Sequence, residues 1–213
     1  MNIAIIDYGS GNLRSAKKAF EHVLADLGGG TVTLTHDPSN LTNASHIVLP
    51  GVGAFADCKE GLISINGMID ALHEQVINEA KPFLGICVGM QLMADVSHEK
   101  GDTNGFGWIP GDVVAITPQN KDLKVPHMGW NSLQINHSAH PAVSGLPNGA
   151  HTYFVHSYHF VTKDPSHVLA TVNYGAPLNA IIGRDNIIGT QFHPEKSQRM
   201  GLTFINGFLK WRP

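Results

Sequence analysis

Hydrophobic residues in the first half of the chain alternate between strand-like runs and helical spacing. Short apolar runs with the length of buried strands occupy residues 3–7, 31–35, 46–50 and 81–86. Segments with helical spacing separate them, at residues 13–27, 54–63 and 67–79. Asn12 stands where the side chain of a helix N-cap is expected. This order of elements predicts a parallel sheet with helices on both faces.

The second half of the chain has a different composition, which is rich in Gly, Pro and Asn after Lys100. Short runs with strand composition lie at residues 112–116, 132–135, 151–155, 158–162, 168–172 and 180–183. A last helix is predicted over residues 198–211, with its apolar residues on one face. We therefore expect one α/β domain over residues 1–213, with a mostly parallel central sheet and antiparallel additions in the C-terminal half.

The strand at residues 81–86 leads into Gly85-Ile86-Cys87-Val88-Gly89, which has the G-x-nucleophile-x-G form of a nucleophile elbow. In such an elbow a sharp strand-to-helix turn exposes the central side chain, and only glycine fits the crowded positions beside it. Residues 90–94 predict the first turns of the following helix, whose N-terminal dipoles favour a thiolate. Cys87 is therefore a candidate nucleophile, whereas Cys58 has no such frame.

A base and a group to orient it stand together in His193-Pro194-Glu195. Residues 187–193 predict another strand, and alternation places His193 and Glu195 on one face of an extended segment. A carboxylate there can fix the imidazole tautomer while the imidazole takes the thiol proton. A cysteine among apolar residues is most often inert when it stands alone. The two fragments together complete one catalytic unit.

Composition and charge exclude several classes of function. Charged residues make up 15% of the chain and the formal net charge is −3, so no basic field indicates a nucleic acid or membrane partner. Two cysteines cannot form a disulfide framework, and the first residues do not resemble a signal peptide, so we expect a cytoplasmic protein. The thirteen histidines include no H-E-x-x-H pattern, and no metal is expected. Gly9-Ser10-Gly11 lacks the third glycine of a dinucleotide loop, so no cofactor is expected either.

Several segments carry a resemblance to a known family. Residues 82–92 and 191–197 resemble the two signature segments of class-I, triad-type glutamine amidotransferases. Residues 7–15, 50–55, 126–131 and 153–158 are similar, more narrowly, to glutaminase subunits of imidazole glycerol phosphate synthases. Because these segments extend from Asp7 to Ser197, the resemblance covers nearly the whole chain.

The resemblance implies an activity and a partner. L-glutamine would be hydrolysed to glutamate and ammonia through a γ-glutamyl thioester on Cys87, with His193 as base and Glu195 as its orienting group. The ammonia would pass inside a heterodimer to a (β/α)8-barrel cyclase subunit. That subunit makes imidazole glycerol phosphate and aminoimidazole carboxamide ribotide in histidine biosynthesis.

Further roles follow for backbone and side-chain groups around the triad. The amide after the nucleophile and an amide of the glycine loop would stabilise the oxyanion, which gives Val88, Val52 and Gly53. The resemblance assigns glutamine binding to Gly51, Gln91, Ser157 and Tyr158. It assigns the docking face for the partner to Asn12, Trp130, Tyr153 and Lys196.

Three other readings remain open at this point. The first is a class-I glutaminase that serves a different synthase, such as those for anthranilate, guanylate or pyridoxal phosphate. The segments Pro50-Gly51-Val52-Gly53 and Met128-Gly129-Trp130-Asn131 argue against it. The second is a stand-alone cysteine hydrolase, which would be active without a partner. The third is a non-catalytic binding subunit, and the complete set of Cys87, His193 and Glu195 argues against it.

Overall fold

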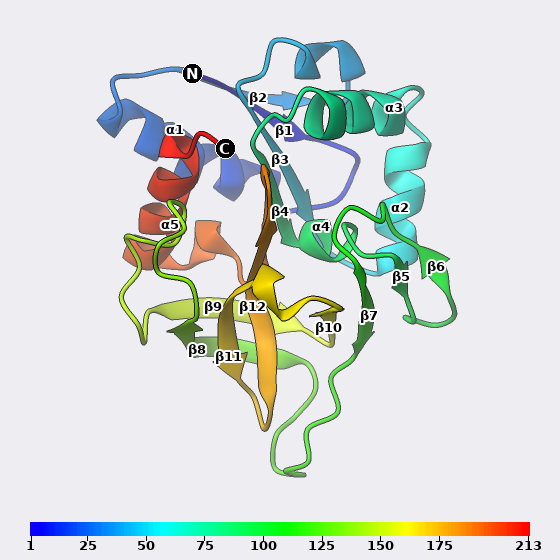
Figure 1. Cartoon of the computed structure of the whole chain (residues 1–213). Helices are drawn as coiled ribbons and strands as arrows, with labels where there is room; N and C mark the ends of the chain where they lie inside the picture. Colours follow the sequence, from blue (N-terminus) through cyan, green and yellow to red (C-terminus); the bar gives the residue numbers. More distant parts are fainter.

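A computed structural model describes all 213 residues and contains one large sheet flanked by helices (Figure 1). Its strands are β1 (Asn2–Ile6), β2 (Thr31–Thr35), β3 (His46–Gly51), β4 (Phe83–Cys87), β8 (His127–Ile135), β9 (His151–His156), β11 (Val168–Asn173), β12 (Pro177–Arg184) and β13 (Ile187–Thr190). They are ordered β2-β1-β3-β4-β13-β12-β11-β8-β9. The strand order places β4 and β13, which lead to the two catalytic fragments, side by side.

One half of the sheet is parallel. Strands β2, β1, β3, β4 and β13 all run in the same direction. The apolar runs of β1, β3, β4 and β13 are buried, as expected for strands covered on both faces, whereas the edge strand β2 is partly exposed. In this arrangement the carboxyl ends of β3 and β4 meet at one edge, with Gly51 opposite Cys87. The α/β architecture predicted from the alternating pattern is confirmed.

The other half is antiparallel, as predicted for the C-terminal half of the chain. Strands β12, β11, β8 and β9 pair in antiparallel fashion. A second sheet has the order β10-β7-β5-β6 and consists of β5 (Val96–Ser97), β6 (Thr103–Asn104), β7 (Gly111–Ala115) and β10 (Tyr158–Thr162). Strand β8 begins at His127 and not at residue 132, because Gly129 interrupts its alternation. Strands β5 and β6 are too short for periodicity to reveal them.

The helices cover both faces of the parallel half. They are α1 (Leu13–Asp26), α2 (Phe55–Ile63), α3 (Met68–His73), α4 (Val88–Gln91) and α5 (Gln198–Lys210), with a π-helical turn at Glu74–Asn78 after α3. Short 3-10 turns lie at Pro38–Leu41, Pro165–His167 and Pro194–Lys196. Figure 1 shows α1 and α5 together on one face and α2, α3 and α4 on the other. Phe20 of α1 meets Phe208 of α5 edge to face, with 6.4 Å between ring centroids.

Three local predictions were wrong. Asn12 occupies the N-cap position of α1, but its side chain makes no capping hydrogen bond. The helix expected over residues 90–94 is the single turn α4, because the backbone turns toward the loop at residues 105–109 after Gln91. The strand expected over residues 187–193 ends at Thr190, and Glu195 lies in a 3-10 turn that begins at Pro194.

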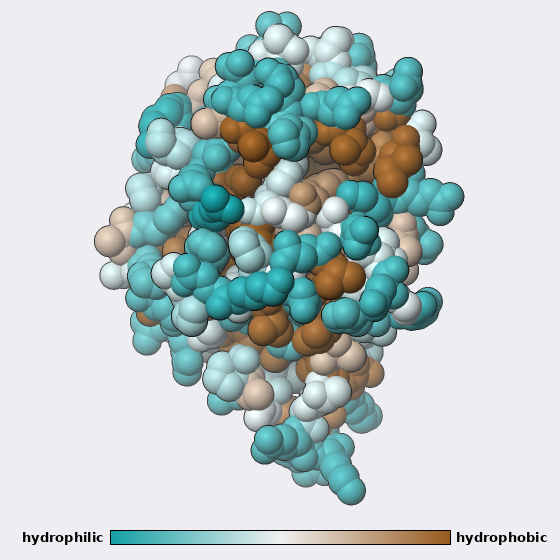
Figure 2. Space-filling model, turned by 45° about the vertical axis from the view of Figure 1, so that its right-hand side comes forward, coloured by the Kyte–Doolittle hydropathy of each residue, from teal (hydrophilic) through white to brown (hydrophobic).

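The face shown in Figure 2 is mainly hydrophilic, with hydrophobic residues in separate patches. The hydrophilic tip at the lower end of that view is the loop between β7 and β8, which projects in the same direction in Figure 1. Among the exposed large apolar side chains are Met128 and Trp130 of β8, which are 62% and 47% exposed. None of the helices has the length and apolar character that a membrane crossing requires.

Candidate active site

Cys87 stands at the sharp turn between β4 and α4. Its backbone has φ 55° and ψ −110°, a conformation that non-glycine residues rarely adopt. Strained backbone of this kind is found where it serves function, because folding alone gives no reason to keep it. The turn carries the thiol away from the strand and into a cavity, as the elbow motif predicts.

The two glycines of the elbow are required by close backbone contacts. A Cβ on Gly89 would overlap the carbonyl oxygen of Leu49 in β3. A Cβ on Gly85 would overlap the carbonyl oxygen of Gly89. Strand β3 and the turn can therefore approach closely only when both positions lack a side chain.

His193 and Glu195 form a buried pair beside Cys87. The distance between His193 Nδ1 and Glu195 Oε1 is 2.9 Å, and both side chains are almost completely buried. Ser197 fixes the turn that carries them, since its hydroxyl donates to the His193 carbonyl at 2.6 Å and accepts from the Tyr153 amide at 3.0 Å. The sequence placed both side chains on one side of an extended segment. The structure joins them through a 3-10 turn instead.

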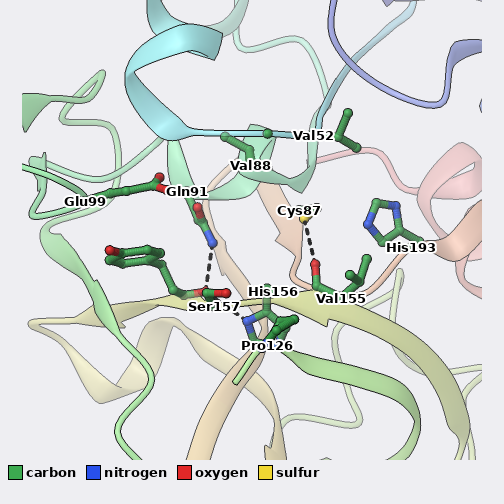
Figure 3. Close-up of a pocket in the computed structure, with 12 residues that line it drawn as sticks. Val52, Cys87, Val88, Gln91, Glu99, Pro126, Val155, His156, Ser157 and His193 are labelled. Carbon is green, nitrogen blue, oxygen red and sulfur yellow. Dashed lines mark hydrogen bonds between the residues drawn. The ribbon is translucent and has the colours of Figure 1, made fainter. Parts of the chain in front are cut away.

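Two opposing effects set the charge of His193. Burial by itself lowers the pKa of the imidazole, but the interactions with Cys87 and with Glu195 outweigh it and raise the pKa to about 9. Nδ1 is committed to Glu195, while Nε2 has no hydrogen-bond partner within the protein. In Figure 3 the ring of His193 faces Cys87 across the cavity. The free nitrogen is thus placed to exchange a proton with the thiol or with a bound molecule.

A cavity of about 290 Å³ opens over Cys87 (Figure 3). Eight residues predicted for the site line it: Val52, Gly53, Cys87, Val88, Gln91, Ser157, Tyr158 and His193. Glu195 lies behind His193, and Gly51 packs below the loop against Tyr8 and Gly89. No group of three or more His, Cys, Asp or Glu side chains is clustered closely enough to hold a metal ion.

The loop after β3 is held by side chains from outside the predicted site. The Val52 amide donates to Ser10 Oγ at 3.0 Å, and Ser10 Oγ donates to the Val52 carbonyl at 2.5 Å. The thiol of Cys58 donates to the same carbonyl at 3.4 Å. Gly53 follows with φ +99° and lines the cavity. In this conformation the Val52 amide is bonded to the loop after β1, and the Val52 carbonyl is bonded both to that loop and to α2.

Four further residues line the cavity without a role predicted from the sequence: Glu99, Pro126, Val155 and His156. The last three lie in segments that carry the family resemblance, and Glu99 does not. Glu99 accepts a hydrogen bond from the Phe55 amide at the start of α2, at 2.8 Å. It lies in a polar turn with no periodic pattern, so no sequence signal indicates that it reaches the site. A fifth residue, Gln191, is fully buried behind the nucleophile and donates to Cys87 Sγ at 3.7 Å.

Gln91 is fixed on both sides of its amide nitrogen. Its Nε2 donates to the Tyr158 carbonyl at 3.0 Å and to Gln191 Oε1 at 3.1 Å. Both N–H groups are therefore used within the protein, which leaves the oxygen of Gln91 as the atom that can accept a bond from a ligand.

Three of the four residues predicted for the docking face gather on one surface. The rings of Trp130 and Tyr153 lie 6.0 Å apart, and Lys196 Nζ lies 5.8 Å from the centroid of the Tyr153 ring. Asn12 stands at the start of α1, next to Gly11, where an added Cβ would lie 3.1 Å from Pro50 Cβ. The Asn12 side chain makes no capping hydrogen bond there.

Comparison with known proteins agrees with this geometry. A family model for class-I glutamine amidotransferases matches residues 4–210. The chain belongs to this family. Relatives at more than half identity support the narrower resemblance. The HisH subunit of imidazole glycerol phosphate synthase from Brucella melitensis is 54% identical over 217 residues. The subunit of the same name from Rhodospirillum rubrum is 55% identical over 214 residues, and both alignments cover 100% of each chain.

Solved structures of the class-I glutamine amidotransferase fold are also similar. One glutamine amidotransferase gives a TM-score of 0.68 at 18% identity and covers 95% of this chain and 98% of its own. The glutaminase domain of CTPS from Trypanosoma brucei, solved with bound acivicin, gives a TM-score of 0.66 at 16% identity over 100% and 95%. At this identity the likeness establishes the shared fold.

Proposed function

We propose that the chain hydrolyses L-glutamine to glutamate and ammonia through Cys87, His193 and Glu195. It would act as the glutaminase subunit of an imidazole glycerol phosphate synthase in the cytoplasm. The observation that carries this proposal is the strained Cys87 at a cavity that His193 also lines, with Glu195 bonded to the far side of the imidazole. The names of the relatives at more than half identity supply the synthase.

Before the reaction the thiol proton resides on His193 Nε2, because a pKa of about 9 keeps that imidazole protonated at neutral pH. Cys87 Sγ then attacks the side-chain amide carbon of glutamine as the thiolate. His193 then protonates the departing nitrogen, the C–N bond breaks and ammonia leaves. Water hydrolyses the γ-glutamyl thioester and restores the thiol. Glu195 holds the Nδ1–H throughout and does not carry the transferred proton.

The tetrahedral intermediate needs donors for its oxyanion. The Val88 amide directly follows the nucleophile and is one candidate. The Val52 amide is the second, but it is bonded to Ser10 Oγ and becomes available only when its peptide turns. Because one missing oxyanion donor costs about 10² to 10³ in rate, this peptide can decide whether the enzyme is active.

Polar groups around the rest of the cavity suit the amino-acid end of glutamine. The free oxygen of Gln91 and the carboxylate of Glu99 are acceptors for an ammonium group. The backbone of Ser157 and Tyr158 lines the cavity beside Gln91 and would bind the carboxylate of the substrate.

The partner would be the (β/α)8-barrel cyclase subunit, docked on the surface formed by Trp130, Tyr153 and Lys196. The family resemblance adds Asn12 to this docking face. Two exposed apolar side chains on β8, Met128 and Trp130, support an interface on this face. Docking there would receive ammonia directly and would turn the Val52 peptide toward the cavity.

The test is glutamate production by the purified chain, alone and with the cyclase subunit and its ribonucleotide substrate. We expect slow turnover by the chain alone and strong stimulation in the complex. Cys87→Ala should abolish glutamine-dependent synthesis and leave synthesis from added ammonia intact, because the second reaction belongs to the partner. Fast turnover that the partner does not change would instead favour the stand-alone hydrolase.

A further inference from the structure

A chain of hydrogen bonds runs from the surface strand β8 to the wall of the cavity. Asn131 Nδ2 lies 3.2 Å from His127 Nε2, and His127 Nδ1 lies 2.9 Å from His156 Nε2. His156 Nδ1 lies 2.9 Å from the Tyr158 carbonyl oxygen. Both imidazoles are buried, and neither has a part in the proposed chemistry.

The partners fix the tautomer of each ring. His156 Nδ1 faces a carbonyl, which can only accept, so this nitrogen carries the proton and Nε2 is an acceptor. His127 must then donate from Nδ1, and its Nε2 accepts from the Asn131 amide. Every nitrogen in the chain has one role when both rings are neutral. A further proton on either ring would direct two N–H groups at each other.

Packing holds the first ring in its plane. His127 lies between Phe154 and Tyr174, with centroid distances of 4.7 and 4.0 Å and nearly parallel rings. His127 and His156 are direct cross-strand partners in the β8–β9 pair. Burial lowers the pKa of His127 to about 4 and that of His156 to about 3, which agrees with two neutral rings.

The last hydrogen bond of this series reaches the carbonyl of Tyr158, in the segment proposed to bind glutamine. The Tyr158 carbonyl accepts from His156 Nδ1 at 2.9 Å and from Gln91 Nε2 at 3.0 Å. These two donors orient the peptide after Tyr158 and hold the side chain of Gln91. Ser157 lies between β9 and β10, and its carbonyl accepts from the Ile116 amide at 2.8 Å.

We propose that His127 and His156 are positioning residues for substrate binding. As two neutral, Nδ1-protonated imidazoles, they hold the Ser157–Tyr158 segment and Gln91 in the arrangement that receives the amino-acid end of glutamine. This inference rests on the proposed function for the identity of the ligand, and the hydrogen-bond chain itself can be tested without any ligand.

Matched substitutions separate the two hydrogen bonds of each ring. In His156→Asn the side-chain amide occupies the place of Nδ1 and can still donate to Tyr158, whereas His156→Gln reaches only the Nε2 position. We expect His156→Gln to raise KM for glutamine by about three- to tenfold, the effect of one lost hydrogen bond, with little change in kcat. His156→Asn should stay closer to the native KM.

The corresponding two substitutions at His127 act one hydrogen bond further from Tyr158. His127→Asn keeps the donor to His156, and His127→Gln keeps only the acceptor for Asn131. The KM should therefore rise more in His127→Gln. His140→Asn is the control, because His140 is a half-buried imidazole that bonds to the Ala142 amide and packs on Trp211, outside the cavity lining. It should leave KM unchanged.

A tautomer measurement completes the test. Two-bond ¹H–¹⁵N correlation spectra of the full chain at neutral pH should show both His127 and His156 protonated on Nδ1. An Nε2-protonated form of either ring would overturn the proposal, and so would equal KM values for His156→Asn and His156→Gln in folded proteins. If the native complex does not turn over glutamine, the proposed function fails. The tautomers of His127 and His156 still decide whether the series of hydrogen bonds from Asn131 to Tyr158 exists.

Discussion

At the scale of single residues, the proposed mechanism divides the work behind Cys87 between two chemically different groups. His193 would carry the proton, whereas Glu195 would keep the ring in place through one hydrogen bond of 2.9 Å. His193→Asn should lower glutaminase kcat in the stimulated complex by about 10² to 10⁴, the usual contribution of a general acid-base group. Glu195→Gln should lower it less, as measured by glutamate release.

Folding controls are essential for this comparison, because both side chains are buried. Thermal unfolding midpoints should show that the two variants remain folded. Equal losses of activity, or a larger loss in the Glu195→Gln enzyme, would show that Glu195 does more than orient the imidazole.

Ser10 is a residue whose role only the structure indicates. Its hydroxyl accepts from the Val52 amide and donates to the Val52 carbonyl, so it holds the peptide that we propose as an oxyanion donor. Ser10→Ala should raise glutamate release by the isolated chain, up to about the 10²- to 10³-fold that one oxyanion donor contributes. Ser10→Thr keeps the hydroxyl and should retain low basal activity. Unchanged basal activity in both variants would mean that another contact controls the loop.

At the scale of elements, the elbow depends on how closely α4 approaches β3. A Cβ on Gly89 would overlap the backbone of Leu49, which cannot move without displacing a central strand. Gly89→Ala should therefore lower the free energy of unfolding by about 3 kcal/mol or more, at the upper end of overpacking effects. Urea denaturation measures this loss.

Gly145→Ala is the matched control for that substitution. Its new Cβ would lie 3.0 Å from a methyl group of Thr203, which is a side chain at the surface, and its backbone has no positive φ. The loss of stability should be much smaller. Similar losses at the two positions would contradict the close approach at the elbow.

Long elements and compact motifs were predictable, because their signals are local. Period and length gave the parallel strands and α1, α2 and α5, and the spacing around Cys87 gave the elbow. The short strands β5 and β6 gave no signal, since two residues cannot show a period. The turn at Glu195 was misjudged because alternation was extended through Pro194, which begins a 3-10 turn.

The missed site residues share one property: long-range hydrogen bonds define their roles. Ser10, in the loop after β1, accepts a hydrogen bond from the Val52 amide in the loop after β3. Glu99 accepts one from the Phe55 amide at the start of α2. Gln191 was part of a quoted motif, and its position as a buried polar side chain after an apolar strand was a usable signal. Periodicity indicates which face of a helix or strand a residue occupies. It does not indicate which residue far along the sequence will be its hydrogen-bond partner.

At the scale of the whole molecule, buried histidines link stability to pH. Burial lowers the pKa of His46, His127 and His156 from 6.5 to about 4, 4 and 3. As pH falls from 6.5 toward 4, the unfolded chain binds protons at these rings and the native protein does not, so stability falls. Each ring contributes a slope of up to about 1.4 kcal/mol per pH unit.

His193 acts in the opposite direction and in a different range. Its pKa is raised to about 9, so its contribution to stability is complete below pH 6.5 and is lost as pH rises through 9. Urea midpoints at constant ionic strength should therefore fall on both sides of neutrality. A midpoint that stays constant or rises between pH 6.5 and 4 would contradict the neutral, buried state of the three other rings.

The central claim, that Cys87 is the nucleophile of a glutaminase, has a direct test in covalent labelling by a glutamine-like diazo-ketone. The chain offers its own control thiol, because Cys58 is equally buried but bonded to the Val52 carbonyl. Peptide mapping by mass spectrometry should find the label on Cys87 alone, formed faster in the presence of the partner and blocked by excess glutamine. Labelling of Cys58 with loss of turnover, or full turnover in an enzyme without Cys87, would contradict the account.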